Sequence, residues 1–179
     1  MQIEIRDIKI QNRLFCEKTV LELPNHGLYV IHGDNGSGKT LLLRTMFIET
    51  NAEACYVSQS NERIIENTGC IENITLFDED KKKDAIRQLE YFHLEYLMNR
   101  DMEKLSGGEK RLVCLLRGFL SEGEFLFIDE PTNDIDLKNI DRLLDLLRDF
   151  KKINILLLFP MMTELMQLLT KSMFCKTKN

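Results

Sequence analysis

The sequence predicts an α/β fold with a mainly parallel core sheet. Three short apolar runs, at 28–31, 125–128 and 155–158, have the length and composition of strands that are buried on both faces. Helical patterns at 41–48 and 108–120 lie between them along the chain. Buried strands that alternate with helices are typical of α/β proteins with a parallel sheet.

The remaining strands are predicted from apolar residues in the first third of the chain. Alternating isoleucines within 3–10 predict a strand with a change of phase, and the apolar residues within 20–23 predict a second strand. Residues 54–57 have the pattern of another short strand.

Two amphipathic faces are predicted farther along. Residues 61–104 are mostly polar and helical, and one expected apolar face comprises Ile86, Leu89, His93, Tyr96 and Leu97. A later helix is expected to bury Leu137, Ile140, Leu143, Leu144 and Leu147. A last helix is expected from about Thr163. We therefore expect a single domain over 1–179, with 61–104 inserted as a helical subdomain.

Composition and charge argue against several classes of protein. With 24 basic and 29 acidic side chains the net charge is −5, which argues against a chain that coats nucleic acid or an anionic membrane. The longest apolar stretch, 155–162, is far shorter than the ~20 residues that cross a bilayer. The 5 cysteines are dispersed and never in CxxC spacing, so free thiols in a reducing compartment are expected.

A glycine-rich segment directly follows the strand pattern of 28–31. It comprises Gly33, Asp34, Asn35, Gly36, Ser37, Gly38, Lys39 and Thr40. The GxxxxGK[ST] spacing between a strand and a helix predicts a phosphate-binding loop, or P-loop. Its glycines let successive backbone N–H groups point at phosphate, and the helix N-terminus favours anions. Lys39 is expected to reach the β- and γ-phosphates, and Thr40 to offer its hydroxyl to Mg²⁺.

Two acidic residues, Asp129 and Glu130, follow the strand pattern of 125–128. Ligands of open α/β sheets bind at the carboxyl ends of the strands. We expect Asp129 to hold Mg²⁺, directly or through water, and Glu130 to polarise an attacking water. A helix cap after the strand would explain one of these acids but not the pair.

A third motif, Leu105-Ser106-Gly107-Gly108-Glu109, opens the helix of 108–120. A serine cap and glycines at a helix N-terminus attract anions. With the three motifs in this order, the chain resembles the ATPase domain of ABC proteins, whose signature is LSGGE. The resemblance extends from the first strand to about Leu169. It implies a P-loop NTPase core whose antiparallel β-subdomain is trimmed, because the stretch from Lys39 to Gln59 is short for the family.

The resemblance also implies roles for individual residues. Gln59 matches a glutamine that contacts Mg²⁺ and communicates with a transport partner, and Phe15 lies where an aromatic residue stacks on adenine. Asp136, within 133–136, matches the family's D-loop aspartate. Nucleotide contacts are thus implied for Phe15, the loop of 33–40, Ser106, Gly107, Gly108, Glu109 and Asp136. Residues 69–77 resemble a segment of ABC exporters, although an ordinary amphipathic turn explains them as well.

The family works as a dimer, so the resemblance implies a second ATPase subunit, identical or different. Each ATP would lie between the P-loop of one subunit and the LSGGE helix of the other. ATP binding would close the dimer and hydrolysis would reopen it, driving a separate transmembrane subunit at the cytoplasmic face of the membrane. Cargo and direction would depend on that subunit, and no nucleic acid is expected.

The sequence departs from the family at the switch histidine, which follows the last core strand. The chain has Phe159 and Pro160 there, and its histidines, His26, His32 and His93, all precede Asp129. Slow hydrolysis is therefore expected, with Glu130 retained as the base. Two alternatives stay open: a weakly hydrolysing, nucleotide-gated regulator, and a soluble ATPase of translation, in which the run 130–133 also occurs.

Overall fold

The computed structural model falls into two compact units that share the chain. The first contains residues 1–56, 123–129 and 151–179, and the second contains 57–122 and 130–150. Within them the structure describes 2–5, 7–10, 13–22, 27–50, 53–60, 64–149 and 154–159. The helical insertion expected at 61–104 falls within the second unit, and the single domain over 1–179 stays a prediction.

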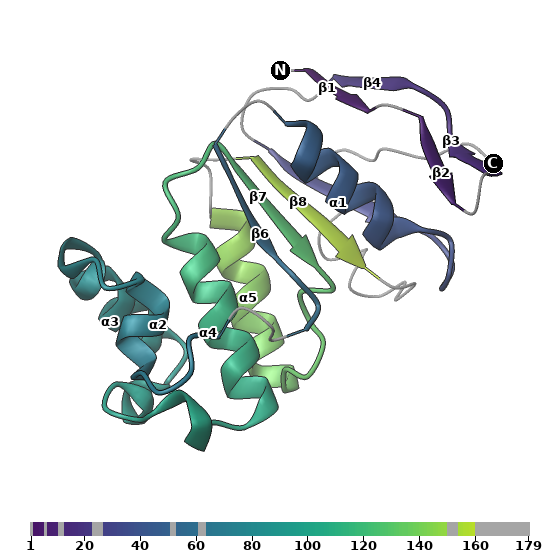
Figure 1. Ribbon diagram of the computed structural model, residues 1–179. Helices are drawn as coiled ribbons and strands as arrows, with labels where there is room; N and C mark the ends of the chain where they lie inside the picture. Colours follow the sequence, from purple (N-terminus) through teal and green to yellow (C-terminus); the bar gives the residue numbers. More distant parts are fainter. Residues whose placement is uncertain are drawn as a thin grey trace. The chain divides into compact units, whose positions relative to one another are not determined.

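The core sheet of the first unit has the strand order β5-β8-β7-β6 (Figure 1). Its strands are β5 (Leu28–His32), β6 (Ala54–Val57), β7 (Phe125–Asp129) and β8 (Asn154–Phe159). β8 runs parallel to both neighbours, with Leu157 opposite Val30 and Leu156 opposite Phe127. The parallel core sheet predicted from the apolar runs is therefore confirmed.

Two antiparallel strand pairs precede this sheet. β1 (Gln2–Ile5) pairs with β4 (Thr19–Glu22), and β2 (Ile8–Ile10) pairs with β3 (Arg13–Cys16). The change of phase within 3–10 is thus a break between two strands. β3 was not predicted, because four residues are too short for alternation to stand out.

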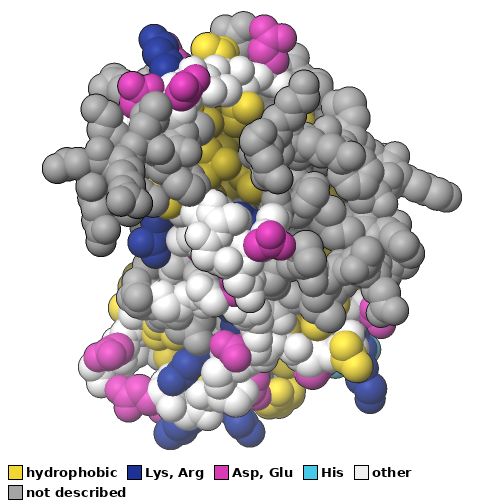
Figure 2. Space-filling view, turned by 90° about the vertical axis from the view of Figure 1, so that its right-hand side faces the viewer, with side chains coloured by type: hydrophobic (Ala, Val, Ile, Leu, Met, Phe, Trp, Pro, Cys, Tyr) yellow, Lys and Arg dark blue, Asp and Glu magenta, His cyan; other side chains and the backbone are white. Residues whose placement is uncertain are grey.

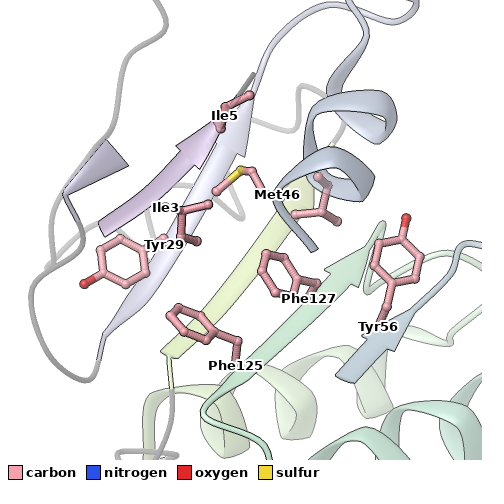
Figure 3. Packing of buried hydrophobic residues seen from close by; sticks show 8 residues of the cluster. Ile3, Ile5, Tyr29, Met46, Tyr56, Phe125 and Phe127 are labelled. Atoms are coloured by element: carbon pink, nitrogen blue, oxygen red, sulfur yellow. The ribbon is translucent and has the colours of Figure 1, made fainter. Parts of the chain in front are cut away.

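The core of the first unit lies between helix α1 (Lys39–Glu49), strand β1 and the core sheet (Figure 3). Its buried members are Ile3, Ile5, Tyr29, Leu43, Met46, Tyr56, Phe125 and Phe127. The ring of Phe47 on α1 packs 5.4 Å from that of Tyr56 and 5.8 Å from that of Phe127, centroid to centroid. This packing fixes α1, whose first residues are Lys39 and Thr40.

The described part of the second unit is helical (Figure 1). Its α-helices are α2 (Cys70–Thr75), α3 (Lys82–Tyr91), α4 (Gly107–Phe119) and α5 (Leu137–Asp149). Short 3-10 turns cover Glu79–Lys81, Glu95–Leu97 and Met102–Lys104. α4 contacts both α2 and α3 and buries most of its side chains. Among the described helices, none is long and apolar enough to cross a membrane.

The two predicted apolar faces are partly wrong. Leu89 and Leu97 are buried as expected, but His93 and Tyr96 are exposed because α3 ends at Tyr91 and the helical period stops there. On α5 the side chain of Leu137 is 81% exposed, since it is the first residue of the helix, whereas Leu143, Leu144 and Leu147 are buried. The helix expected from Thr163 lies outside the described residues.

Candidate functional site

The glycine-rich loop of the first unit joins β5 to α1 and is curled by its glycines. Gly36 and Gly38 have φ angles of 79° and 83°, in the left-handed region that glycine tolerates best. The backbone N–H of Ser37 donates to the carbonyl of Asp34 at 3.1 Å, which closes the turn. The loop therefore ends directly at the N-terminus of α1, where Gly38 is the N-cap.

Lys39 lies folded against this loop. Its Nζ donates hydrogen bonds to the carbonyl oxygens of Gly33 and Asp34, each at 2.9 Å. An ammonium has three donors and no acceptor, so both carbonyl and phosphate oxygens can accept hydrogen bonds from it. The loop itself thus holds the cation at the start of α1.

Thr40 and Tyr56 both bond to the buried carboxylate of Asp129, the last residue of β7. Thr40 Oγ1 donates to Oδ1 at 3.3 Å and Tyr56 OH donates to Oδ2 at 3.2 Å. Burial is the main cause that raises the pKa of Tyr56, and Asp129 raises it further, while Arg44 acts in the opposite direction. Tyr56 was not predicted, because strand alternation alone does not show which carboxylate its hydroxyl reaches.

The oxygen groups around Asp129 fit Mg²⁺. The described residues contain no group of three or more His, Cys, Asp or Glu side chains that could hold a metal alone. Mg²⁺ is usually held by one or two protein oxygens together with water and phosphate. One carboxylate and the Thr40 hydroxyl suit that requirement.

In the second unit, Glu130 is held by two side-chain amides. Its Oε2 accepts a hydrogen bond from Gln59 Nε2 at 2.6 Å and another from Asn133 Nδ2. The backbone of Glu130 has a φ of 49°, which is uncommon for a residue with a Cβ. The structure therefore brings together two residues to which the sequence assigned separate roles, Gln59 and Glu130, and it adds Asn133.

Ser106 and Glu109 form a capping box at the N-terminus of α4. Glu109 N donates to Ser106 Oγ at 3.3 Å, and Ser106 N donates to Glu109 Oε2 at 2.7 Å. Tyr96 OH donates to the other carboxylate oxygen, Oε1, at 2.7 Å, and this bond is the largest cause that raises the pKa of Tyr96 to about 12. Burial alone would raise the pKa of Glu109, but the bonds from Tyr96 and Ser106 outweigh it and leave that pKa below its ordinary value.

The two glycines of the motif differ in their surroundings. A Cβ added at Gly108 would overlap the backbone carbonyl oxygen of Asp134, so only glycine fits there. A Cβ added at Gly107 would meet no atom of the described chain within 4 Å. The packing within this unit therefore explains Gly108 but not Gly107.

Three other predicted residues are placed as follows. The carboxylate of Asp136 precedes α5 and accepts from Asn139 N at 2.9 Å and from Asn139 Nδ2 at 3.1 Å, as a helix cap. Phe15 belongs to β3, but its side chain lies outside the described residues, and so does Pro160.

A glycine-rich loop between a parallel strand and a helix, followed by a lysine and a hydroxyl that meets a strand-end carboxylate, defines a P-loop nucleotide-binding domain. The model of the family described as "ABC transporter" matches residues 16–133. The chain belongs to this family, as an ATP-binding domain and an ATPase.

Individual relatives agree with the family. A Helicobacter pylori protein named "Probable iron chelatin transport ATP-binding protein" is 28% identical, over 85% of this chain and 73% of that protein. The molybdate import ATP-binding protein MolC of Haemophilus influenzae is 30% identical, over 78% and 62%. Elongation factor 3 of Pneumocystis carinii is 29% identical over 72% of this chain, which spans 13% of that protein.

A solved structure has the same fold. It is described as "An inward-facing conformation of a putative metal-chelate type ABC transporter", with a TM-score of 0.68 and 22% identity. The match covers 88% of this chain and 71% of that chain.

Proposed function

We propose that the chain is the ATP-hydrolysing subunit of a membrane transporter, which binds Mg-ATP and drives a separate transmembrane subunit. The observation that carries the proposal is the hydrogen bond between Thr40, in the first turn of the helix after the P-loop, and Asp129, 89 positions away at the end of β7. This bond puts a hydroxyl and a carboxylate, two groups that suit Mg²⁺, directly beside a phosphate-binding loop.

The first unit supplies the proposed phosphate site. The ammonium of Lys39 would exchange the carbonyls of Gly33 and Asp34 for phosphate oxygens, which bear more negative charge. Thr40 and Asp129 would hold Mg²⁺, which when bound neutralises charge on the phosphates.

The second unit supplies the proposed base. The carboxylate of Glu130 would take a proton from the attacking water, and the amides of Gln59 and Asn133 orient it. Turnover is expected to be slow, because the position of the family's switch histidine has Phe159 and Pro160.

The signature helix is proposed to meet ATP bound to a second ATPase subunit, in a homo- or heterodimer. Gly107 supports this, because a Cβ added there would meet no atom of the described residues within 4 Å. Both oxygens of Glu109 are engaged within its own chain, so we assign Glu109 to shaping the helix N-terminus that receives the nucleotide.

The surface of 59–77 is proposed to bind the transmembrane subunit at the cytoplasmic face of the membrane. Leu76 and Phe77 follow α2 with left-handed backbones and are 55% and 59% exposed. Adjacent exposed apolar side chains of this kind are typical of contact sites between proteins. The exporter-like character of 69–77 stays a prediction, and the import named for MolC favours the opposite direction.

A second candidate, a soluble ATPase of translation, is favoured by the run 130–133 and by the likeness to elongation factor 3. Charge speaks against it. Lys and Arg are interspersed with Asp and Glu on the described part of the face in Figure 2, and the net charge is −5. Binding to ribosomes at physiological salt would favour this candidate over the transporter.

A nucleotide titration tests the proposal. Lys39→Ala removes a cation from the phosphate site and should weaken Mg-ATP binding at least about tenfold. Lys104→Ala removes an exposed lysine that pairs with Asp101 and should leave the affinity unchanged. Equal affinities of the wild type and the Lys39 variant would contradict the site.

A further inference from the structure

The guanidinium of Arg111, on the second turn of α4, is fully buried. It donates one hydrogen bond from NH1 to the carbonyl oxygen of Ser58 and another from NH2 to the carbonyl oxygen of Glu130, the latter at 2.9 Å. Burying a cation is costly unless hydrogen bonds compensate it, so these two bonds are a condition for this side chain to lie there.

The two carbonyls belong to the backbone at or next to the two residues of the proposed hydrolytic site, Gln59 and Glu130. Ser58 directly precedes Gln59, and Gln59 donates to the carboxylate of Glu130 at 2.6 Å. Arg111 therefore closes a ring: its guanidinium joins the two backbones, and the amide–carboxylate bond joins the two side chains. A change in either connection shifts the other.

The left-handed backbone of Glu130 makes this support necessary. With a φ of 49° the residue lies in a sparsely populated region, which persists only where surrounding contacts fix it. The bond from Arg111 holds the carbonyl of that same residue. The planar fork of arginine reaches two carbonyls at once, whereas the ammonium of lysine is a point charge.

We propose that Arg111 is a positioning residue that holds Glu130 and Gln59 in register for hydrolysis. It rests on the proposed function, in which Glu130 is the base. Because Arg111 follows Gly107 and Gly108 by about one turn of the same helix, a displacement of the N-terminus of α4 is passed to Glu130. Contact of that N-terminus with a partner's nucleotide thus adjusts the base of this subunit.

The test compares two arginines of α4. Arg111→Lys keeps the charge and loses the fork, and a misplacement of the base on the order of 1 Å is expected to lower kcat about tenfold to a hundredfold. Mg-ATP affinity and KM should change less than about twofold, since Lys39 and Thr40 are untouched. Arg117→Lys is the matched control, because Arg117 bonds to the backbone oxygen and Oδ1 of Asn73, at 2.5 and 2.7 Å, away from Glu130.

A double mutant separates positioning from a general structural role. If Arg111 acts through Glu130, Arg111→Lys should lower kcat in the wild type and have little further effect in Glu130→Gln. Equal fold losses in both backgrounds, or a wild-type kcat in Arg111→Lys, would overturn the inference. A wild-type kcat in Glu130→Gln alone would instead overturn the proposed base.

Stability is measured alongside. Arg111→Lys and Arg117→Lys should both lower the melting temperature, but only the former should lower kcat. If Arg111→Lys does not fold, Arg111→Gln, which keeps two amide donors without the charge, is tested with the same expectations. If neither Arg111 variant folds while Arg117→Lys does, Arg111 has only a structural role and the inference is overturned.

Discussion

The P-loop and the surroundings of α4 hold their cations in different ways. Lys39 bonds to carbonyls five and six residues away, within the loop that carries it. Arg111 bonds to the carbonyl of Ser58, 53 residues away, and to that of Glu130. The P-loop thus contains both carbonyl partners of its own cation. The surroundings of α4, by contrast, reach their geometry only after segments distant in the sequence have come together.

This difference decides what a short motif can specify. Glycines at the left-handed positions Gly36 and Gly38 favour the curl of the loop locally. By contrast, the bond between Gln59 and Glu130 spans 71 residues and depends on the fold of the whole second unit. Changes in the second region are therefore expected to affect catalysis and stability while the phosphate loop keeps its shape.

Glu130→Gln is expected to have the largest effect and to sharpen the comparison. The amide keeps the shape of the carboxylate but loses its basicity, so kcat should fall about 10²–10⁴-fold. Mg-ATP affinity should stay near the wild-type value, because the P-loop is unchanged. Steady-state hydrolysis and a nucleotide titration measure both, with Glu122→Gln, at an exposed carboxylate, as the control. A small loss of kcat would mean that the surroundings of α4 support the structure without supplying the catalytic base.

Asn73→Ala tests the hydrogen bonds that join distant segments of the second unit, away from the proposed catalytic residues. The buried amide of Asn73 bonds to Ile65 N and to its carbonyl, at 2.9 and 3.0 Å, and to Arg117 at 2.7 Å. Without the Asn73 amide, its buried partners lose these hydrogen bonds, which should lower the free energy of unfolding by about 1–3 kcal/mol.

Asn139→Ala is the matched local control, since the side-chain amide of Asn139 bonds to residues three positions away on either side, Asp136 and Arg142, each at 3.1 Å. Denaturant unfolding of both variants should show the larger loss for Asn73→Ala. An equal or smaller loss than for Asn139→Ala would break the distinction between long-range and local support.

Glu109→Gln is expected to have the smallest effect, below about 1 kcal/mol at neutral pH. The pKa of Glu109 in the folded protein lies below its ordinary value, so its charge stabilises the fold above the unfolded-state pKa. That stabilisation is lost as the pH falls through the folded-state pKa. The wild type should therefore melt above Glu109→Gln at pH 7, and the difference should shrink below about pH 4.

Glu103→Gln, which makes the same chemical change at an exposed residue near the start of α4, serves as the comparison. A difference between the wild type and Glu109→Gln that stayed constant from pH 7 to pH 3 would show that charge is not the cause.

The parts of the fold that the sequence predicted are those with strong local signals. The apolar runs of β5, β7 and β8 predicted the parallel sheet, and the glycine spacing predicted the loop before α1. β3 is too short for such a signal, and the end of α3 at Tyr91 depends on packing that a periodic pattern does not contain. The apolar face predicted from the periodicity therefore extended beyond the end of the helix.

The candidate site divides in the same way. The acidic pair Asp129 and Glu130 at the end of β7 and Gln59 after β6 were found from motifs, and their roles stay predictions. The bond between Gln59 and Glu130 was not predicted. Tyr56, Arg111 and Asn133 were not assigned contacts with these groups, because their partners are set by how strands and helices pack. Arg111 directly follows Glu109 and Lys110 in the sequence, so no local pattern marked it as the charge that would be buried.

The close approach of Gly108 to the backbone of Asp134 has a genetic consequence. No side chain can move aside there, because the obstacle is a main-chain carbonyl, so every substitution at Gly108 must displace the signature helix or the D-loop. Such a variant keeps its own P-loop. With shared sites as proposed, it would still occupy a place in a dimer while spoiling the ATP site of a normal partner. Alleles at Gly108 should therefore be dominant over the wild type, whereas alleles that prevent folding should be recessive.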